Sequence, residues 1–485
     1  MSRSSSDSGS GQIMSPTPFR LTDDLPSGVT VLEASAGTGK TYAIAGLVTR
    51  YVAAGMRLPQ LLVVTFTRAA TAELRDRVRR RLVGVAAHLD TVLAGGPAGS
   101  DDEVAAHLAR GDDATVRQRL GHLHRALTEF DAATIATIHG FCQHVLHGVG
   151  LASDVERDAE FLEDQAELLD TVVDDVYVRT FRGLGEIEGA PTRSDLRQIA
   201  EAVVANPDAV IVPEDPEDRW VGLRVRLAHE IRAEVERRKR GSRLLSYDDL
   251  LTRLAATLRD PVRGPAARRR LRDQYRVALV DEFQDTDPIQ WEILARTFGD
   301  DGSALVLIGD PKQAIYSFRG ADVYAYLEAA GRAATRHTLV TNWRSDGSLL
   351  DAYNVLFDGA AFGDDRIPYR EVAPPDHHRS SRLIGGEGSP LRIRVVTREA
   401  EGVRFYGRNR YAFADSAREH LARDLAAEIV TLLRAAPTLV ERRPDGSERK
   451  DPLRPGDVAV LARTNDEAAR VQRALHDVGV PAIIN

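Results

Sequence analysis

Several features are scarce or missing in this sequence. Cys142 is the only cysteine among 485 residues, which excludes an internal disulfide and any zinc site built from several thiolates. One thiol fits a reducing compartment, so we predict a cytoplasmic location. The longest apolar runs, such as Ala304 to Ile308, fall far short of the roughly 18 to 20 residues that cross a bilayer. We therefore expect no transmembrane helix and no membrane partner.

An export signal and a basic net charge are also missing. Residues 1–18 are rich in serine and glycine and contain no apolar stretch after Arg3, which is typical of a flexible tail. The net charge is −8, so binding to a polyanion requires local basic stripes or backbone amides. Only four of the 64 basic residues are lysines, which draws attention to the positions that keep one.

The composition and the apolar pattern predict an α/β protein. With 43% hydrophobic and 28% charged residues the chain resembles ordinary globular proteins, and its length allows about three domains of roughly 150 residues. Short apolar runs are each followed by a helical pattern, as in a parallel sheet with crossover helices. The expected strands are Val29 to Glu33, Gln60 to Phe66, Ala133 to Ile138, Val277 to Asp281, Ala304 to Gly309 and Thr338 to Thr341.

The long spacing between the third and fourth strands predicts a helical insertion. We expect it at residues 151–243, inside a first domain made of residues 19–150 and 244–358. Residues rich in Gly, Pro, Asp and His form an expected linker at 359–390. Part of a second α/β domain should follow at 391–485, with strands at 391–396 and 457–462 and helices near 416–434 and 466–478.

A phosphate-binding loop is the strongest motif. Small residues between a predicted strand and a helical pattern let backbone N–H groups converge on phosphate oxygens, and the helix N-terminus adds a favourable dipole. Lys40 would neutralise the β and γ phosphates, and the Thr41 hydroxyl would hold Mg²⁺. The predicted ATP-binding residues are Ala34, Ser35, Ala36, Gly37, Thr38, Gly39, Lys40 and Thr41, with Ala34 in place of the usual first glycine.

Two adjacent acids end an apolar strand, where open parallel sheets place their ligands. Asp281 is the Mg²⁺ candidate, and Glu282 would orient and deprotonate the attacking water. An Asp-Glu pair after a strand is more often a turn or a helix cap, so this interpretation depends on Lys40. We expect both carboxylates to face Lys40 across one crevice.

Two further clusters follow the next strands. After Gly309, the Gln313 amide can hydrogen-bond a γ-phosphate, and Phe318 can stack on a base, although an isolated Phe is more often a core residue. In the tetrapeptide Asn342 to Ser345, Arg344 suits the stabilisation of transition-state charge and Trp343 can stack on adenine.

Six segments together resemble the helicase motifs of the UvrD/Rep superfamily, in the same order. Within this superfamily, GDPKQAIYSFRGAD with EASAGTGKT is most similar to the RecB branch, and the similarity extends from about residue 19 to the C-terminus. The segments are EASAGTGKT, VVTFTRAATAELRDRV, TIATIHGFCQ, LVDEFQDTDPIQ, LIGDPKQAIYSFRGAD and TNWRS.

The resemblance implies an ATP-dependent DNA helicase acting in recombination and double-strand-break repair, with RecC-like and RecD-like partner subunits. It implies that Gln313 senses the γ-phosphate, that Trp343 stacks on adenine and that Arg344 acts as an arginine finger. Single-stranded or duplex-end DNA would contact Thr65, Phe66, Thr137, His139, Phe318 and Arg319. Six arginines between Phe66 and Arg81 could attract DNA phosphates despite the acidic total.

The family's later motifs V and VI, its accessory 2B domain and a RecB-type nuclease have no counterpart in the sequence, so we expect a truncated motor with weak turnover by itself. We predict no nuclease activity. A non-catalytic fragment that binds ATP and DNA is one alternative, and an unrelated P-loop NTPase is another. DNA-stimulated turnover that depends on Lys40 would favour the motor.

Overall fold

The computed structural model describes residues 16–148, 160–161, 165–182, 189–205, 209–299, 302–317, 320–386, 388–442 and 447–484. Its contacts divide the chain into two compact units, with the division after Val340. Each unit is described by itself. Residues 341–358 fall in the second unit, whereas the sequence analysis assigned them to the first domain.

The first unit is built on a seven-stranded sheet in which every pair of neighbours is parallel. The strand order is β1-β9-β2-β8-β7-β3-β4. Non-consecutive neighbours require crossover connections, which the intervening helices supply. The strands are β1 (Thr17–Pro18), β2 (Gly28–Ala34), β3 (Leu61–Thr65), β4 (Thr134–Thr137), β7 (Val277–Val280), β8 (Ala304–Gly309) and β9 (Thr335–Leu339).

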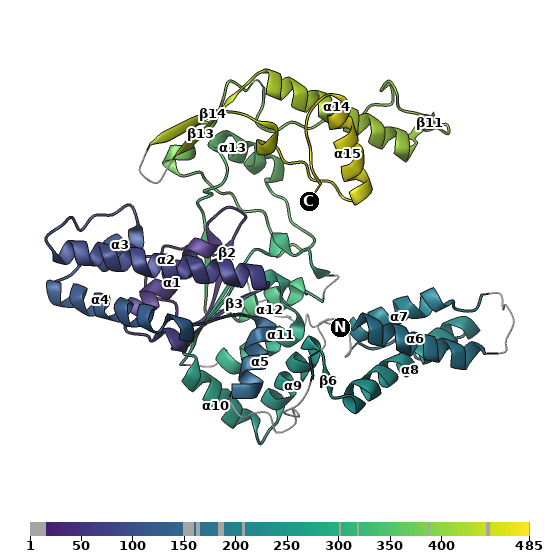
Figure 1. Cartoon of the computed structure of the whole chain (residues 1–485), viewed down its shortest axis with the longest axis horizontal. Coiled ribbons are helices and arrows are strands. Elements are labelled where there is room, and N and C mark those ends of the chain that lie inside the picture. The colour runs from purple at the N-terminus through teal and green to yellow at the C-terminus, as the bar shows by residue number, and fades with distance from the viewer. Residues whose placement is uncertain are drawn as a thin grey trace, which may run out of the picture. The chain divides into compact units, whose positions relative to one another are not determined.

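Helices cover both faces of this sheet (Figure 1). One layer consists of α1 (Lys40–Ala53), α2 (Arg68–Leu93), α3 (Glu103–Leu108) and α4 (Asp113–Thr128), and the other of α5 (Ile138–Gly148), α9 (Tyr247–Arg259), α10 (Gly264–Gln274), α11 (Pro288–Phe298) and α12 (Val323–Arg332). Leu32, Val306 and Ile308 pack into the core under α1 to α4. Their strand neighbours Val31 and Leu307 are equally buried and point to the opposite face. Two buried faces explain why the strands read as continuous apolar runs.

The insertion is helical, as the spacing predicted. Three helices, α6 (Ala166–Phe181), α7 (Arg193–Ala205) and α8 (Arg219–Gly241), pack around a separate apolar cluster that includes Val172, Leu196 and Ile231. The short strands β5 (Glu160–Phe161) and β6 (Leu244–Leu245) pair in parallel where the chain enters and leaves the three helices. The assignment of these helices as a 1B-type subdomain stays a prediction.

The second unit has smaller sheets and two main helices. Its apolar cluster forms where α14 (Ala414–Arg434) packs on α15 (Asn465–Asp477). The remaining elements are α13 (Gly347–Phe357), an antiparallel sheet of β10 (Leu383–Ile384), β13 (Thr438–Arg442) and β14 (Glu448–Pro452), and a hairpin of β11 (Phe405–Tyr406) and β12 (Tyr411–Ala412).

The strands expected at 391–396 and 457–462 are wrong. Both segments lie wholly within the described chain, and neither forms a ladder there with another strand. Ile393 and Val395 are 72% and 78% exposed, so this apolar run buries little surface. An apolar run becomes a strand only when a neighbour accepts its backbone hydrogen bonds. Among the described helices, none has the length and apolar character to span a membrane.

Candidate nucleotide site and DNA-binding edge

The predicted functional segments lie at one edge of the sheet, because parallel strands all end on the same side. The phosphate loop follows β2, and the next strands of the sheet, β8 and β7, lead into residues 310–313 and 281–282. Then come β3 and β4, whose last residues Thr65 and Thr137 are register partners. The sheet order therefore places the nucleotide motifs together and the predicted DNA contacts beside them.

The phosphate loop has the backbone conformation that its glycines allow. Gly37 and Gly39 adopt φ values of 79° and 88°, a left-handed region that side-chain-bearing residues rarely adopt. Between them, Thr38 turns the chain back: its N–H and its hydroxyl both donate to the Ser35 carbonyl, at 3.2 and 2.7 Å. Helix α1 begins at Lys40, so its free N–H groups face the loop. Ala34 is fully buried at the end of β2, and its side chain packs into the core.

Of the two strand-end carboxylates, Glu282 contacts Lys40 directly. The Lys40 ammonium lies 2.6 Å from Glu282 Oε2, and both side chains are only partly exposed. Asp281 accepts a hydrogen bond from the Glu282 N–H at 2.9 Å, and its own N–H donates to Val64 of β3. Glu282 has a φ of 51°, unusual for a residue with a side chain.

Two carboxylates near Lys40, those of Asp281 and Asp285, are in an environment that disfavours their ionisation. Burial raises the pKa of Asp281 to about 6, helped by the Glu282 charge and opposed by Lys40. The pKa of Asp285 is raised to about 6 for the same reasons. Among the residues that the structure describes, none makes a hydrogen bond to its buried Oδ1. Carboxylates with a raised pKa are typical of functional sites. A bound cation would lower the pKa of these two side chains again and favour their ionised form.

Magnesium fits this set of side chains. The Asp281 carboxylate and the Thr41 hydroxyl are hard oxygen donors, and Mg²⁺ commonly binds one or two carboxylates together with substrate phosphates. Within the described residues, no group of three or more His, Cys, Asp or Glu side chains is arranged to hold a metal by itself. When ionised, the half-buried Asp281 and the buried Asp285 carry negative charge that a divalent ion would offset.

A buried charge network, which the sequence did not predict, adjoins Gln313, the residue predicted to sense the γ-phosphate. The Gln313 amide donates to Asp310 Oδ2 at 2.6 Å, and the other Asp310 oxygen lies 2.7 Å from the Lys312 ammonium. Lys312 in turn lies 3.6 Å from Glu33 of β2, which is also within 3.9 Å of Arg336. The scarcity of lysine was the one sequence signal that pointed to this position.

The predicted DNA contacts occupy the neighbouring edge. The Thr65 hydroxyl is buried and lies 2.6 Å from that of Thr71, so it stabilises the start of α2. The Phe66 ring stacks on Tyr316 with centroids 5.3 Å apart, a partner that the sequence analysis did not name. Thr137 accepts a hydrogen bond from the Gly140 N–H at the start of α5.

His139 is mostly covered. Burial lowers the pKa of its imidazole, and nearby Asp248 partly offsets the shift, so the ring is largely neutral at physiological pH. The other two predicted DNA contacts, Phe318 and Arg319, lie outside the described residues.

Trp343 and Arg344 belong to the second unit. Trp343 is 53% exposed, with one tilted contact to His377, and Arg344 is exposed. The Asn342 side chain accepts hydrogen bonds from the backbone N–H groups of Arg344 and Ser345, at 2.9 and 3.0 Å. These bonds fix the turn formed by residues 342–345. Their roles with nucleotide stay predictions.

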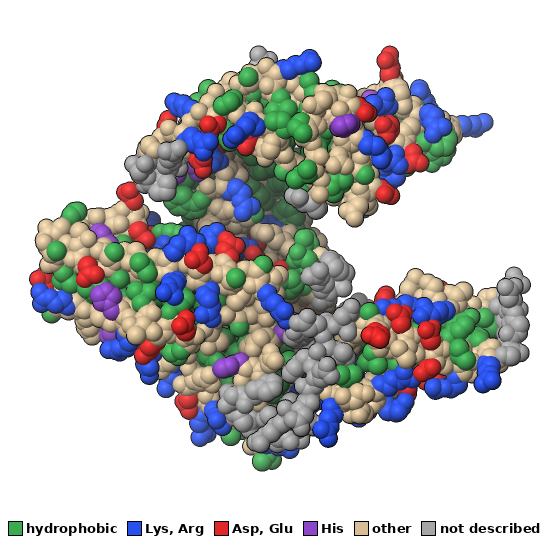
Figure 2. Space-filling model, in the orientation of Figure 1, with side chains coloured by type: hydrophobic (Ala, Val, Ile, Leu, Met, Phe, Trp, Pro, Cys, Tyr) green, Lys and Arg blue, Asp and Glu red, His purple; other side chains and the backbone are tan. Residues whose placement is uncertain are grey.

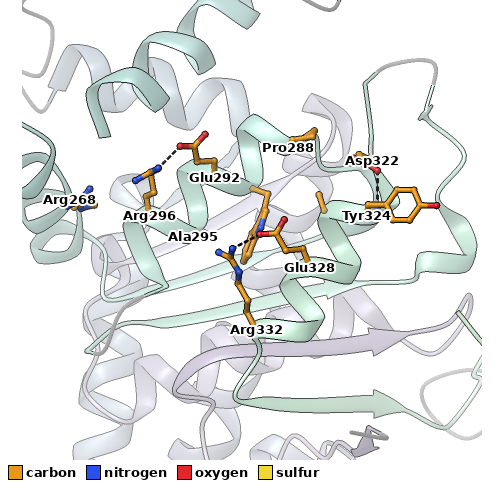
Figure 3. Close-up of a pocket in the computed structure, with 11 residues that line it drawn as sticks. Arg268, Pro288, Glu292, Ala295, Arg296, Asp322, Tyr324, Glu328 and Arg332 are labelled. Carbon is orange, nitrogen blue, oxygen red and sulfur yellow. Dashed lines mark hydrogen bonds and ion pairs between the residues drawn. The ribbon is translucent and has the colours of Figure 1, made fainter. Parts of the chain in front are cut away.

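A groove of about 610 Å³ lies elsewhere, on the outer side of α11 and α12 (Figure 3). Its lining includes Trp291 and Ala295. The lining also carries the ion pairs Arg296–Glu292 and Arg332–Glu328, which Figure 3 shows. No residue of the phosphate loop lines it. The phosphate site is thus defined by loop geometry and charge, and this groove is a separate feature.

A model of the UvrD/REP helicase N-terminal domain matches residues 20–334. The chain therefore belongs to the UvrD/REP helicase family, as its motifs predicted.

Within this family the chain is similar to RecB subunits. It is 42% identical over 470 residues to the RecBCD enzyme subunit RecB of Mycobacterium tuberculosis (strain ATCC 25618 / H37Rv), covering 96% of this chain and 41% of that protein. It is 41% identical over 461 residues to the RecBCD enzyme subunit RecB of Mycolicibacterium smegmatis, covering 94% of this chain and 40% of that protein. It is 28% identical over 585 residues to the RecBCD enzyme subunit RecB of Escherichia coli (strain K12), covering 94% of this chain and 48% of that protein. The chain thus spans less than half the length of these relatives.

Proposed function

We propose that the first unit binds Mg²⁺-ATP and is the ATP-hydrolysing core of a RecB-like motor that moves along single-stranded DNA in recombination and double-strand-break repair. One observation carries this proposal: the Lys40 ammonium and the Glu282 carboxylate lie 2.6 Å apart, between a phosphate loop and Asp281. An opposed cation and carboxylate at a loop of this kind are the two charges that phosphoryl transfer to water requires.

Each side chain has a distinct task in this proposal. Lys40 and the N-terminus of α1 bind the β and γ phosphates, while Asp281 and Thr41 hold Mg²⁺, which offsets the phosphate charge. The phosphates compete with Glu282 for Lys40, and the released Glu282 carboxylate accepts a proton from the attacking water. Gln313 donates its amide to the γ-phosphate, and Trp343 and Arg344 contact adenine and the transferring phosphoryl group.

DNA would bind at the carboxyl ends of β3 and β4. Phe66 offers an aromatic face there, although its ring already stacks on Tyr316. The arginines of α2 are partly occupied: Arg77 and Arg80 pair with Glu73 and Asp76, one turn away. Exposed pairs of this kind are weak, so DNA phosphates can displace the acids.

We further propose that the partners are single-stranded or duplex-end DNA and RecC-like and RecD-like subunits, since the similar proteins are named as RecBCD enzyme subunits. In Figure 2 side chains of both signs are intermixed on each unit. Docking to such partners would therefore depend on local contacts rather than on a face of one charge.

Nucleotide binding and turnover test the proposal. Binding of a fluorescent ATP analogue with Mg²⁺, and phosphate release with and without single-stranded DNA, are measured for the 485-residue chain. Lys40→Ala should weaken binding and abolish DNA-stimulated release, a loss on the order of a hundredfold or more, because a charge-assisted phosphate contact disappears. Lys450→Ala is the matched control, because Lys450 forms an exposed ion pair with Glu448 in the second unit.

Three results separate the candidates. Stimulated release that depends on Lys40 supports a motor. Binding that depends on Lys40, without release above that of Lys40→Ala, supports a non-catalytic fragment. Nucleotide binding that Lys40→Ala leaves unchanged overturns the proposal.

DNA binding is tested through Phe66. Phe66→Ala should weaken binding of a labelled single-stranded oligonucleotide by about five- to a hundredfold, because base stacking contributes roughly 1–3 kcal/mol. Tyr324→Ala, an exposed aromatic in the groove of Figure 3, is the control. Equal affinities of the two variants and the unmodified chain would contradict this placement.

A further inference from the structure

Gln284 is a buried glutamine beside the catalytic carboxylate. It lies in the short helix η3 (Phe283–Asp285), and only 2% of its surface is exposed. Its Nε2 donates to Glu282 Oε2 at 2.9 Å, and its Oε1 accepts the Asp310 N–H, also at 2.9 Å. Because one end must donate and the other must accept, the side-chain amide has a single orientation.

These bonds join two segments that are distant in sequence. On one side, Glu282 pairs with Lys40 of the phosphate loop. On the other, Asp310 begins the turn η4 (Pro311–Gln313) and accepts the Gln313 amide at 2.6 Å. Hydrogen bonds thus run without interruption from Lys40 through Glu282, Gln284 and Asp310 to Gln313.

Both flanking segments are shaped for this bridge. Gly309 has no side chain where a Cβ would lie 2.6 Å from Gln284 Oε1 and 3.1 Å from the Gln284 N atom. A side chain there would displace the amide. Glu282 adopts a left-handed backbone conformation, which costs energy for a residue with a Cβ and persists only when its surroundings hold it. The bond from Gln284 is one of the contacts that hold it.

We propose that Gln284 is a positioning residue: it holds the Glu282 carboxylate at the place of the attacking water and ties that place to the turn that carries Gln313. The inference rests on the proposed function and deepens it. A bound triphosphate takes Lys40 away from Glu282 and Gln313 away from Asp310. The bonds that join Gln284 to Glu282 and to the Asp310 N–H involve none of the donors that would bind phosphate. They therefore persist and keep Glu282 in place.

A double-mutant cycle tests the coupling of Gln284 to Glu282. Gln284→Met has a similar volume and makes neither bond. It should lower turnover about tenfold to a hundredfold and change the affinity for the fluorescent ATP analogue less than about threefold, because only the position of the general base is lost. In a Glu282→Gln background the same substitution should change turnover less than about twofold. Gln118→Met, on the exposed surface of α4, is the control for the chemical change.

Two further variants keep the test independent of folding. Gln284→Glu keeps the acceptor for the Asp310 N–H but places a negative charge beside Glu282, so turnover should fall at least as far as in Gln284→Met. A purely structural role predicts the opposite order, because the Glu variant retains one of the two bonds. Gly309→Ala leaves Gln284 in the chain and should lower turnover by displacing its amide.

The outcomes are distinct. If Lys40→Ala turns over as fast as the unmodified chain, the proposed function fails and the role of Gln284 fails with it. If turnover depends on Lys40 while Gln284→Met and Gln284→Glu are as active as Gln118→Met, only the present inference fails. Equal losses in the Glu282 and Glu282→Gln backgrounds, or a parallel loss of nucleotide affinity, also overturn it.

Discussion

The two units differ in what they bury. In the first unit both faces of the sheet are covered by helices, and even charged groups at its edge, such as Glu33 and Asp310, are buried. In the second unit the apolar cluster lies between two helices, and strand β14 is largely exposed. Water screens charges on an exposed surface and does so much less in an interior. The first unit can therefore hold charges at fixed positions for chemistry.

Their ion pairs illustrate the same difference. The Lys312 side chain is 11% exposed and lies between Asp310 and Glu33. The Lys450 side chain is 59% exposed and pairs with its strand neighbour Glu448 at 3.5 Å. A buried charge that loses its partner is costly, whereas an exposed one is solvated.

The largest expected effect contrasts these two lysines. Lys312→Met should lower the free energy of unfolding of the first unit by about 3–5 kcal/mol, because it leaves Asp310 buried without its cation and removes one of the two cations near Glu33. Lys450→Met should change that of the second unit by less than about 0.5 kcal/mol. Urea unfolding followed by circular dichroism, with the units treated as separate transitions, measures both. Similar effects of the two substitutions would show that burial does not distinguish the units.

Two leucines test the apolar side of the comparison. Leu307, in β8, is fully buried, whereas Leu461, in a segment wrongly expected to be a strand, is 98% exposed. Leu307→Ala should cost about 2–5 kcal/mol because it leaves a cavity. Leu461→Ala should change stability by less than about 0.5 kcal/mol in the same urea measurement. A large loss from Leu461→Ala would mean that this segment is packed.

The pH dependence of stability should have opposite signs in the two units. The pKa of Asp281 is raised to about 6, so the folded form favours the protonated acid, and stability falls as pH rises from about 4 to 6. In metal-free buffer at pH 8, Asp281→Asn should therefore raise the free energy of unfolding by about 1–3 kcal/mol. The same substitution should weaken Mg²⁺-ATP hydrolysis. An unchanged stability at pH 8 would contradict the burial of this charge.

Asp364 in the second unit is the control. A hydrogen bond from Arg366 lowers the pKa of Asp364 to about 2. Its contribution is present above pH 4 and is lost as pH falls towards 2. Asp364→Asn should therefore slightly lower stability at neutral pH, the reverse of Asp281→Asn.

The smallest expected effect concerns Trp343. Because this ring is half exposed, Trp343→Leu should change stability by less than about 1 kcal/mol. If it stacks on adenine, the same change should weaken ATP binding about two- to tenfold, since an aromatic stack contributes roughly 0.5–1.5 kcal/mol. Calorimetric titration measures the affinity. An unchanged affinity would contradict the predicted stacking of Trp343 on adenine.

The sequence predicted the six main strands of the first unit to within a few residues, because buried parallel strands are short apolar runs with clear ends. The same rule failed at 391–396 and 457–462, where the run is present but no neighbouring strand pairs with it in the described chain. In the candidate site, the order of motifs predicted that the segments proposed to bind nucleotide follow neighbouring strands, and they follow β2, β8 and β7. The motifs did not predict the contacts of Gln284, Asp310 and Tyr316. A single amide, carboxylate or aromatic ring has no sequence pattern that shows which residue it will contact.

The linear order of the amino acids determined the family, the phosphate loop and the positions of six strands in the first unit, since glycine conformations, charge and apolar periodicity are local properties. Only the tertiary structure decided that Glu282 meets Lys40, that Gln284 bridges two strand ends, and that Lys312 is enclosed by acids. Those contacts depend on the neighbours that the folded sheet supplies, and they join residues as distant in the sequence as Lys40 and Glu282, which are 242 positions apart.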